Sequence, residues 1–174
     1  VHQITIVPRG EAGGMTISLP TEDKAYLSKK ELEERIAVCL GGRVAEELVL
    51  QDVSTGASSD IQKASEIARA MVTKYGMSEK LGAIAYGSES DEIFLGRSMA
   101  QARTYSEEVA AQIDQEVKDI VDRAHARCRD ILTQHRHQLD ITARYLLDHE
   151  TMDAQTFDHV FTQPDDPELA GYQE

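Results

Sequence analysis

Apolar and polar residues alternate in two short stretches near the start of the chain. These stretches, 4–7 and 15–19, each end at a proline. A period of two predicts β-strands, so we expect a small β-sheet over about residues 1–20. The polar alternate positions of the second stretch suit an edge strand, which could bind an extended peptide through main-chain hydrogen bonds. A hairpin that only closes a core is an equally good interpretation of this pattern.

From residue 28 onward, apolar residues recur every three or four positions, which predicts helices. Ser28 and Glu31 have the spacing of a capping box at the start of the first helix. We expect this helix to continue through Gly41 and Gly42, because apolar residues resume at the same spacing after them. Continuation would suit a close contact at the two glycines.

Four further helices are expected, two long and two short. One begins near Ser58 or Ser59 and ends at Gly76, and its apolar stripe consists of Ile61, Ala64, Ala68, Met71 and Tyr75. A helix of roughly 30 residues follows a second capping-box pattern at 104–107, after an irregular stretch over 77–103. Its apolar stripe consists of Val109, Ile113, Val117, Ile120, Ala124, Cys128 and Ile131.

Two shorter helices are expected around 139–149 and 153–161, and an acidic, disordered tail over 162–174. The predicted fold class is therefore mainly α: a helical bundle with a small β-sheet near the N-terminus.

Composition narrows the range of functions. Of 174 residues, 41% are apolar and 28% charged, and the 18 basic and 31 acidic residues give a net charge of −13. Such a charge argues against non-specific binding to nucleic acid or to an anionic membrane. Cys39 and Cys128 form no CxxC pair, and we expect both to be reduced and buried.

Asp60 is the residue with the clearest chemical potential. It lies in the first turn of a predicted helix, at the border of the buried stripe. A carboxylate near an apolar face needs free backbone N–H groups, a basic side chain or a metal beside it. The alternative, which spacing alone favours, is an ordinary acidic residue that complements the helix dipole.

Several common catalytic motifs do not occur in the sequence. There is no H-E-x-x-H zinc motif, no GxxxxGK[ST] phosphate loop and no G-x-S-x-G elbow. The nearest approach to the zinc motif is the stretch 149–153, where Asp153 stands in place of the second histidine. We interpret that stretch as a helix end followed by a cap.

Five segments, in this order and at this spacing, resemble the peptidase domain of FtsH, the membrane-anchored ATP-dependent zinc metalloprotease. They are VHQITIVPRG at 1–10, LGGRVAEE at 40–47, STGASSD at 54–60, MVTKYGMSEKLG at 71–82 and FLGR at 94–97. The resemblance implies a zinc-metallopeptidase domain over residues 1–161.

The resemblance also implies roles for individual residues. Asp60 would be the third zinc ligand, beside two histidines of an H-E-x-x-H helix. Glu46 would orient a ligand histidine from the second shell, although a solvated surface carboxylate is nearly as good an interpretation. The substrate-binding strand would comprise Met15, Thr16, Ile17, Ser18 and Leu19.

The family's H-E-x-x-H helix would lie just before Val1, and with it the general base, so no catalytic residue is expected in this chain. We expect an N-terminally truncated piece of a longer protein that, alone, holds no zinc tightly and cleaves nothing. The parent would be hexameric, use ATP and magnesium in a separate ATPase module, degrade unfolded or membrane proteins, and lie at the cytoplasmic face of the bacterial inner membrane. It would contact the membrane only through segments absent here. The alternative is a non-catalytic oligomerisation or scaffold module.

Overall fold

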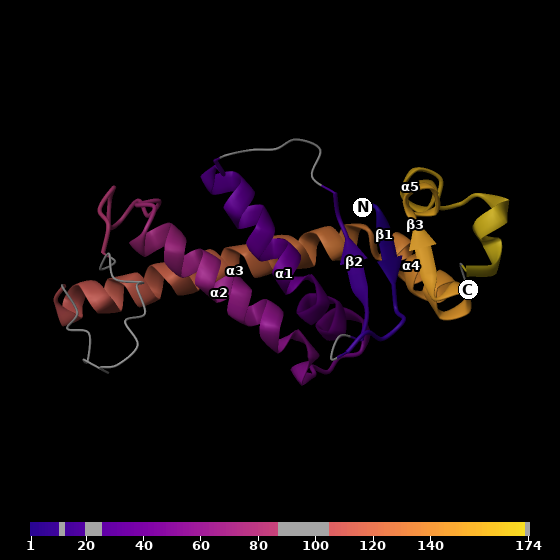
Figure 1. Ribbon diagram of the computed structural model, residues 1–174, viewed down its shortest axis with the longest axis horizontal. Coiled ribbons are helices and arrows are strands. Elements are labelled where there is room, and N and C mark those ends of the chain that lie inside the picture. Colours follow the sequence, from indigo (N-terminus) through magenta and orange to yellow (C-terminus); the bar gives the residue numbers. More distant parts are fainter. Residues whose placement is uncertain (11–12, 20–25, 87–104, 173–174) are drawn as a thin grey trace. The chain divides into compact units, whose positions relative to one another are not determined.

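The computed structural model describes residues 1–10, 13–19, 26–86 and 105–172 (Figure 1). The chain divides into two compact units, one built from 1–25 with 131–174 and the other from 26–130. Helices dominate, and one small antiparallel sheet involves the N-terminal strands. The predicted fold class is therefore confirmed. Thr104 and the segment 94–97, which carried part of the prediction, lie outside the described residues.

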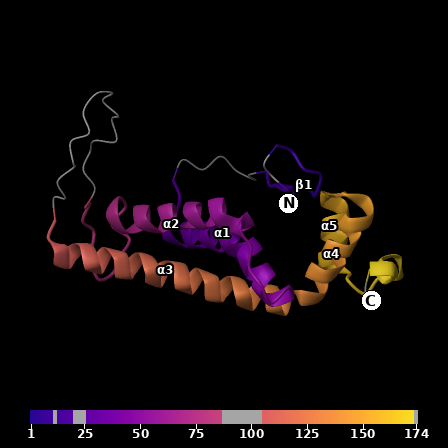
Figure 2. The same ribbon diagram turned by 90° about the horizontal axis from the view of Figure 1, so that it is seen from below.

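The unit 26–130 is built on three helices: α1 (Lys29–Val49), α2 (Ser58–Thr73) and most of α3 (Glu107–Gln134). A short 3-10 helix, η1 (Thr55–Ala57), leads directly into α2. Figure 2 shows α1 and α2 along the same side of α3. Among the described residues of this unit, the largest side chains that are almost fully buried are Ile36, Val44, Met71, Val72 and Ile113.

Local signals in the sequence set the helix ends of this unit. Ser28 and Glu31 form the predicted capping box at the start of α1. Gly76 follows α2 with a φ of +59°, and a Cβ there would lie 2.9 Å from Ala83 Cα, so only glycine fits. At the start of α3, the Ser106 hydroxyl accepts a hydrogen bond from Val109 N.

The glycine pair of α1 behaves partly as predicted. The helix is continuous through Gly41 and Gly42. A Cβ added at either glycine would meet nothing within 4 Å among the described atoms. The expected close contact at the glycines is therefore not seen in the described part of the chain.

The predicted apolar stripes need correction at their ends. Ile61 on α2 is 38% exposed, Tyr75 just after that helix is 50% exposed, and Ile131 on α3 is 44% exposed. Conversely, Glu116 is buried on the inner face of α3. Helical spacing identifies a face, but it does not show how far along the helix a neighbouring element covers that face.

The sheet belongs to the other unit and has the strand order β2-β1-β3. It consists of β1 (Gln3–Thr5), β2 (Met15–Ile17) and β3 (Thr151–Asp153), and β1 pairs antiparallel with both others. The predicted edge position of the second strand is thus confirmed. A helix ends at His149 and Asp153 caps the next helix, so the helix end and cap expected over 149–153 are confirmed, but the strand β3 in the same stretch was missed.

The same unit contains α4 (Arg136–His149), α5 (Ala154–Thr162) and the 3-10 helix η2 (Pro167–Tyr172). Its core consists of Ile141, Leu146, Met152, Val160 and Leu169, with Ile4 packed against it. The expected disordered tail differs from the structure, because Leu169 is only 4% exposed within that core. Leu169 anchors the segment in this core, and Tyr172 packs against the same core.

Both cysteines are free, and burial raises the pKa of each thiol. Cys128 is buried as expected, whereas Cys39 is only half-buried. Among the described residues, no helix combines the length and apolar character needed to cross a membrane.

Candidate metal site

Asp60 lies in the first turn of α2, where the sequence analysis placed it. Its side chain is 49% exposed, which agrees with a position at the border of the buried stripe. The Oδ1 atom lies 3.3 Å from the Nζ atom of Lys63, one turn further along the helix. Because both partners are well exposed, this ion pair stabilises little and would yield readily to a stronger ligand.

The surroundings of Asp60 include the start of α2 and a thiol of α1. The free N–H groups at the start of α2 attract a carboxylate. The Asp60 carboxylate also lies close enough to α1 to influence Cys39: after burial, the charge of Asp60 is the second cause that raises the pKa of that thiol. The carboxylate is therefore accessible and attached to the first turn of a helix.

Zinc fits Asp60 as one ligand of a larger set. Zinc sites in proteins combine carboxylate oxygen, imidazole nitrogen and thiolate sulfur, and catalytic sites use three protein ligands. The stretch 26–130 contains a single histidine, His125, whose Nε2 atom lies 3.1 Å from Glu47 Oε2. Among the described residues, Asp60 belongs to no group of three potential metal ligands, so a complete zinc site there needs ligands from elsewhere.

Glu46 lies near the end of α1 and contacts the loop that leads to α2. Its Oε1 atom accepts a hydrogen bond from the Ser54 hydroxyl at 2.5 Å, and its Oε2 atom accepts one from the Ser54 backbone N–H at 3.1 Å. The hydroxyl bond is the main reason that the pKa of Glu46 is lowered. The sequence analysis selected Glu46 by resemblance and did not foresee this partner.

The neighbouring Glu47 has a different environment. Its carboxylate accepts hydrogen bonds from Arg43 at 3.1 Å and from Arg129 at 2.8 Å, in addition to the His125 contact. Burial opposes its ionisation, yet the adjacent His125 and these donors hold its pKa below the usual range. Glu47 therefore connects α1 to α3, whereas Glu46 binds Ser54.

The predicted substrate strand is only partly regular. Met15, Thr16 and Ile17 form β2. Ser18 and Leu19 follow this strand and are not part of it. Met15 is 40% and Leu19 62% exposed. An edge strand flanked by exposed apolar side chains can accept another extended chain.

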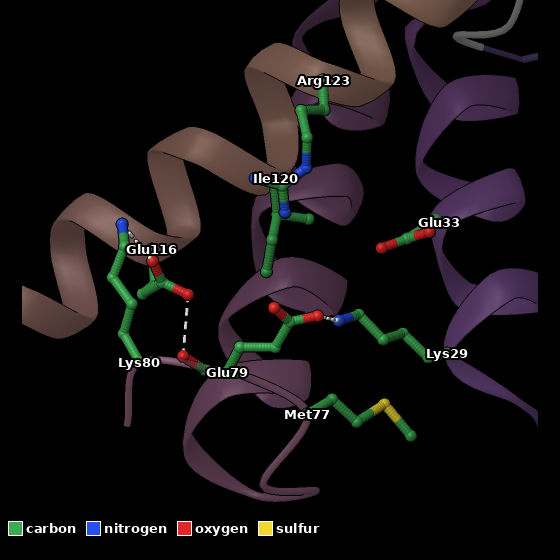
Figure 3. A pocket seen from close by; sticks show the side chains of 9 residues that line it. Lys29, Glu33, Met77, Glu79, Lys80, Glu116, Ile120 and Arg123 are labelled. Carbon is green, nitrogen blue, oxygen red and sulfur yellow. Dashed lines mark hydrogen bonds and ion pairs between the residues drawn. The ribbon is translucent and has the colours of Figure 1, made fainter. Parts of the chain in front are cut away.

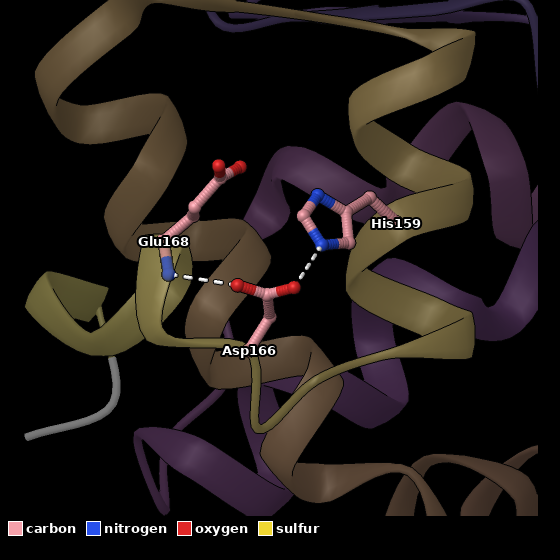
Figure 4. Close-up of side chains that lie close together, drawn as sticks. All are labelled: His159, Asp166 and Glu168. Carbon is pink, nitrogen blue, oxygen red and sulfur yellow. Dashed lines mark hydrogen bonds and ion pairs between the residues drawn. The ribbon is translucent and has the colours of Figure 1, made fainter.

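Two other clusters were not singled out from the sequence. Figure 4 shows His159, Asp166 and Glu168, whose potential ligand atoms lie within 4.8 Å of one another. Asp166 already accepts hydrogen bonds from His159 Nε2 and from the Glu168 backbone N–H, so it caps the start of η2. We interpret this cluster as structural.

Figure 3 shows a second cluster, a pocket of about 320 Å³ lined by side chains of both charges. In it, Glu116 accepts hydrogen bonds from Ser78 and Lys80. Neither cluster could be predicted from spacing, because each joins residues from different elements.

Comparison with known protein families covers nearly the whole chain. Residues 1–160 match peptidase family M41, and the chain belongs to this family. The resemblance to the FtsH peptidase domain is thereby confirmed.

Individual relatives are similar over nearly the whole chain. The chain is 54% identical to ATP-dependent zinc metalloprotease FtsH 2 of Alkaliphilus metalliredigens, over 93% of this chain and 24% of the relative. It is 52% identical to ATP-dependent zinc metalloprotease FtsH of Caldicellulosiruptor bescii, over 97% of this chain and 27% of the relative. For the Bacillus subtilis protein of the same name, identity is 46%, over 97% of this chain and 26% of the relative. The chain thus spans about a quarter of the length of these curated relatives.

Proposed function

We propose that this chain is the peptidase part of an ATP-dependent zinc metalloendopeptidase. The observation that carries the proposal is the accessible Asp60 carboxylate at the start of α2, in a chain of peptidase family M41. The names of the relatives support the reaction and the metal.

In this proposal Asp60 supplies one carboxylate oxygen to the zinc ion. The helix start fixes its backbone, and Lys63 can release the carboxylate because their ion pair is exposed. The bound zinc would polarise the scissile carbonyl and acidify a water molecule. The two histidine ligands and the general base would come from an H-E-x-x-H segment of the full-length protein, since these 174 residues contain no such motif. The isolated chain would then be inactive.

We further propose that the region Met15–Leu19 aligns unfolded polypeptide substrates. The edge position of β2 and the exposed Leu19 support this role. An added strand gains main-chain hydrogen bonds that do not depend on its sequence, which suits a protease acting on many unfolded proteins.

Features of the full-length protein are proposed from the family resemblance alone. They are a separate ATPase module that uses ATP and magnesium, a hexameric ring, and an anchor that holds the protein at the cytoplasmic face of the bacterial inner membrane. The biological role would be quality control of unfolded or membrane proteins.

The proposal is tested by proteolysis with the full-length protein, ATP and zinc, using casein as an unfolded substrate. We expect Asp60→Ala to reduce the rate at least about 100-fold, because it removes a ligand and not merely a supporting contact. Asp52→Ala is the matched control, since that exposed carboxylate lies in the loop before η1. Cleavage by Asp60→Ala at the wild-type rate would contradict the assignment, and inactivity of the wild type would favour the scaffold alternative.

A further inference from the structure

The side chain of Glu46 holds the loop between α1 and α2 by two hydrogen bonds to a single residue. The Ser54 hydroxyl donates to Oε1 at 2.5 Å, and the Ser54 backbone N–H donates to Oε2 at 3.1 Å. Both carboxylate oxygens are thus used, so the position of Ser54 is defined relative to α1 in distance and in direction. Bonds to an ionised acceptor of this kind are stronger than neutral ones.

Ser54 is also the residue that begins the path to Asp60. Its Oγ atom accepts a hydrogen bond from Gly56 N at 3.1 Å, which makes it the N-cap of η1. Ala57, the last residue of η1, is buried, and α2 begins at the next residue. Between Ser54 and Asp60 the chain is therefore 3-10 or α-helical, and a displacement of Ser54 would be passed to the first turn of α2.

Asp60 itself has little local support. Its side chain contacts Lys63, and both side chains are about half-exposed or more. A weak pair of this kind does not fix a rotamer or a backbone position. The position of the carboxylate therefore depends on its backbone, which is held by the packing of α2 against α1 and by the loop that precedes α2.

We infer that Glu46 is a positioning residue that acts through Ser54 to place the Asp60 carboxylate for zinc binding. This inference rests on the proposed function. It differs from the role that resemblance implies, in which Glu46 orients a ligand histidine directly, because here the effect of Glu46 requires the Ser54 hydroxyl. Mutation of a residue that supports a metal ligand typically lowers metal affinity 10- to 100-fold.

A double-mutant cycle on the full-length protein tests the inference. The variants are Glu46→Ala, Ser54→Ala and their combination, and the readout is the zinc Kd from competition with a chromophoric chelator. We expect each single variant to raise the Kd about 10-fold, and the double variant to raise it by much less than the product of the two effects, because both changes remove the bond between the Ser54 hydroxyl and Glu46 Oε1. Ser54→Thr keeps the hydroxyl and should bind zinc almost as the wild type does.

Glu47→Ala is the matched control. It removes a neighbouring carboxylate of α1 that binds Arg43, His125 and Arg129 instead of Ser54. We expect it to lower thermal stability while leaving the zinc Kd within about 2-fold of the wild type. If Glu47→Ala behaves in this way, a general loss of stability does not explain a raised zinc Kd in Glu46→Ala or Ser54→Ala.

A second readout needs no metal. In the zinc-free protein, Glu46→Ala and Ser54→Ala should speed amide hydrogen exchange over residues 54–60, and Ser54→Thr should not. Unchanged exchange, or a Ser54→Ala variant with wild-type zinc affinity beside a weakened Glu46→Ala, would overturn the inference. If Asp60→Ala kept its zinc, the proposed function would fail instead, and amide exchange would still decide whether Glu46 holds the loop.

Discussion

Glu116 is a carboxylate on the inner face of α3, and it is only 8% exposed. Lys80 Nζ and Ser78 Oγ each lie 2.7 Å from one of its oxygens (Figure 3). The hydrogen bond from Lys80 is the main reason that the pKa of Glu116 is lowered, although burial acts in the opposite direction. The charged form is therefore part of the folded structure, and it fastens the turn after α2 to α3.

Replacing Glu116 with Gln should make the free energy of unfolding less dependent on pH in the acidic range. Because the folded-state pKa lies below the ordinary value of 4.5, ionised Glu116 stabilises the fold above that pH, and the contribution is lost as the pH falls through the folded-state pKa. We expect Glu116→Gln to cost about 1–3 kcal/mol at pH 7 and progressively less below about pH 4.5. Urea unfolding at several pH values measures the difference.

Asp130→Asn is the control for this series, since Asp130 is an exposed carboxylate on the same helix. Its effect should stay within about 0.5 kcal/mol of zero at every pH. A Glu116→Gln penalty that was equally large at pH 7 and at pH 3.5 would contradict the role given to the charge.

Single residues were predictable only where the signal lies in one segment. Asp60 could be located because its position depends on a helix start that the sequence marks clearly. The hydrogen-bond partner of Glu46 could not be predicted. Ser54 lies eight residues further along the chain, and only the fold of the intervening loop brings it to Glu46. Glu116 was overlooked because a polarity pattern treats every glutamate as exposed, whereas two donors from another segment stabilise this one inside.

At the scale of elements, helices with strong local signals were predicted well. The capping box at Ser28 and the helix-ending Gly76 each act within one turn. The local sequence therefore contains most of the information on where these helices begin and end. β3 was missed because a strand of three residues has almost no periodicity, and its partner β1 lies nearly 150 positions away. The same lack of local signal hid η2, which is anchored by the buried side chain of Leu169.

The edge strand leads to a prediction about substrate binding. Leu19 follows β2 and is 62% exposed, so a charge there should disfavour apolar segments of an unfolded chain without disturbing a core. We expect Leu19→Asp in the full-length protein to raise the KM for casein about 10-fold and to leave kcat within about 2-fold. Steady-state proteolysis over a range of casein concentrations gives both constants.

Leu147→Asp is the matched control, because Leu147 is 74% exposed on α4 of the same unit and lies outside the proposed strand. Its KM should equal that of the wild type. An equal KM for Leu19→Asp and the wild type would remove the support for substrate alignment at this edge.

At the scale of the whole chain, the two compact units contribute different parts of the proposed activity. The unit 26–130 carries the candidate zinc ligand with its supporting loop, and the other unit carries the edge strand. Neither contains the H-E-x-x-H motif, and the chain covers about a quarter of its relatives. The central claim is therefore that Asp60 serves as one ligand in a site completed by the full-length protein.

Zinc content of the full-length protein tests this claim most directly. Elemental analysis after gel filtration should give about one zinc per chain for the wild type, as expected for a catalytic site with three protein ligands. Asp52→Ala should retain that content, and Asp60→Ala should lose most of it, because two remaining ligands bind zinc weakly. A wild type without zinc, or an Asp60→Ala variant that keeps a full equivalent, would contradict the account.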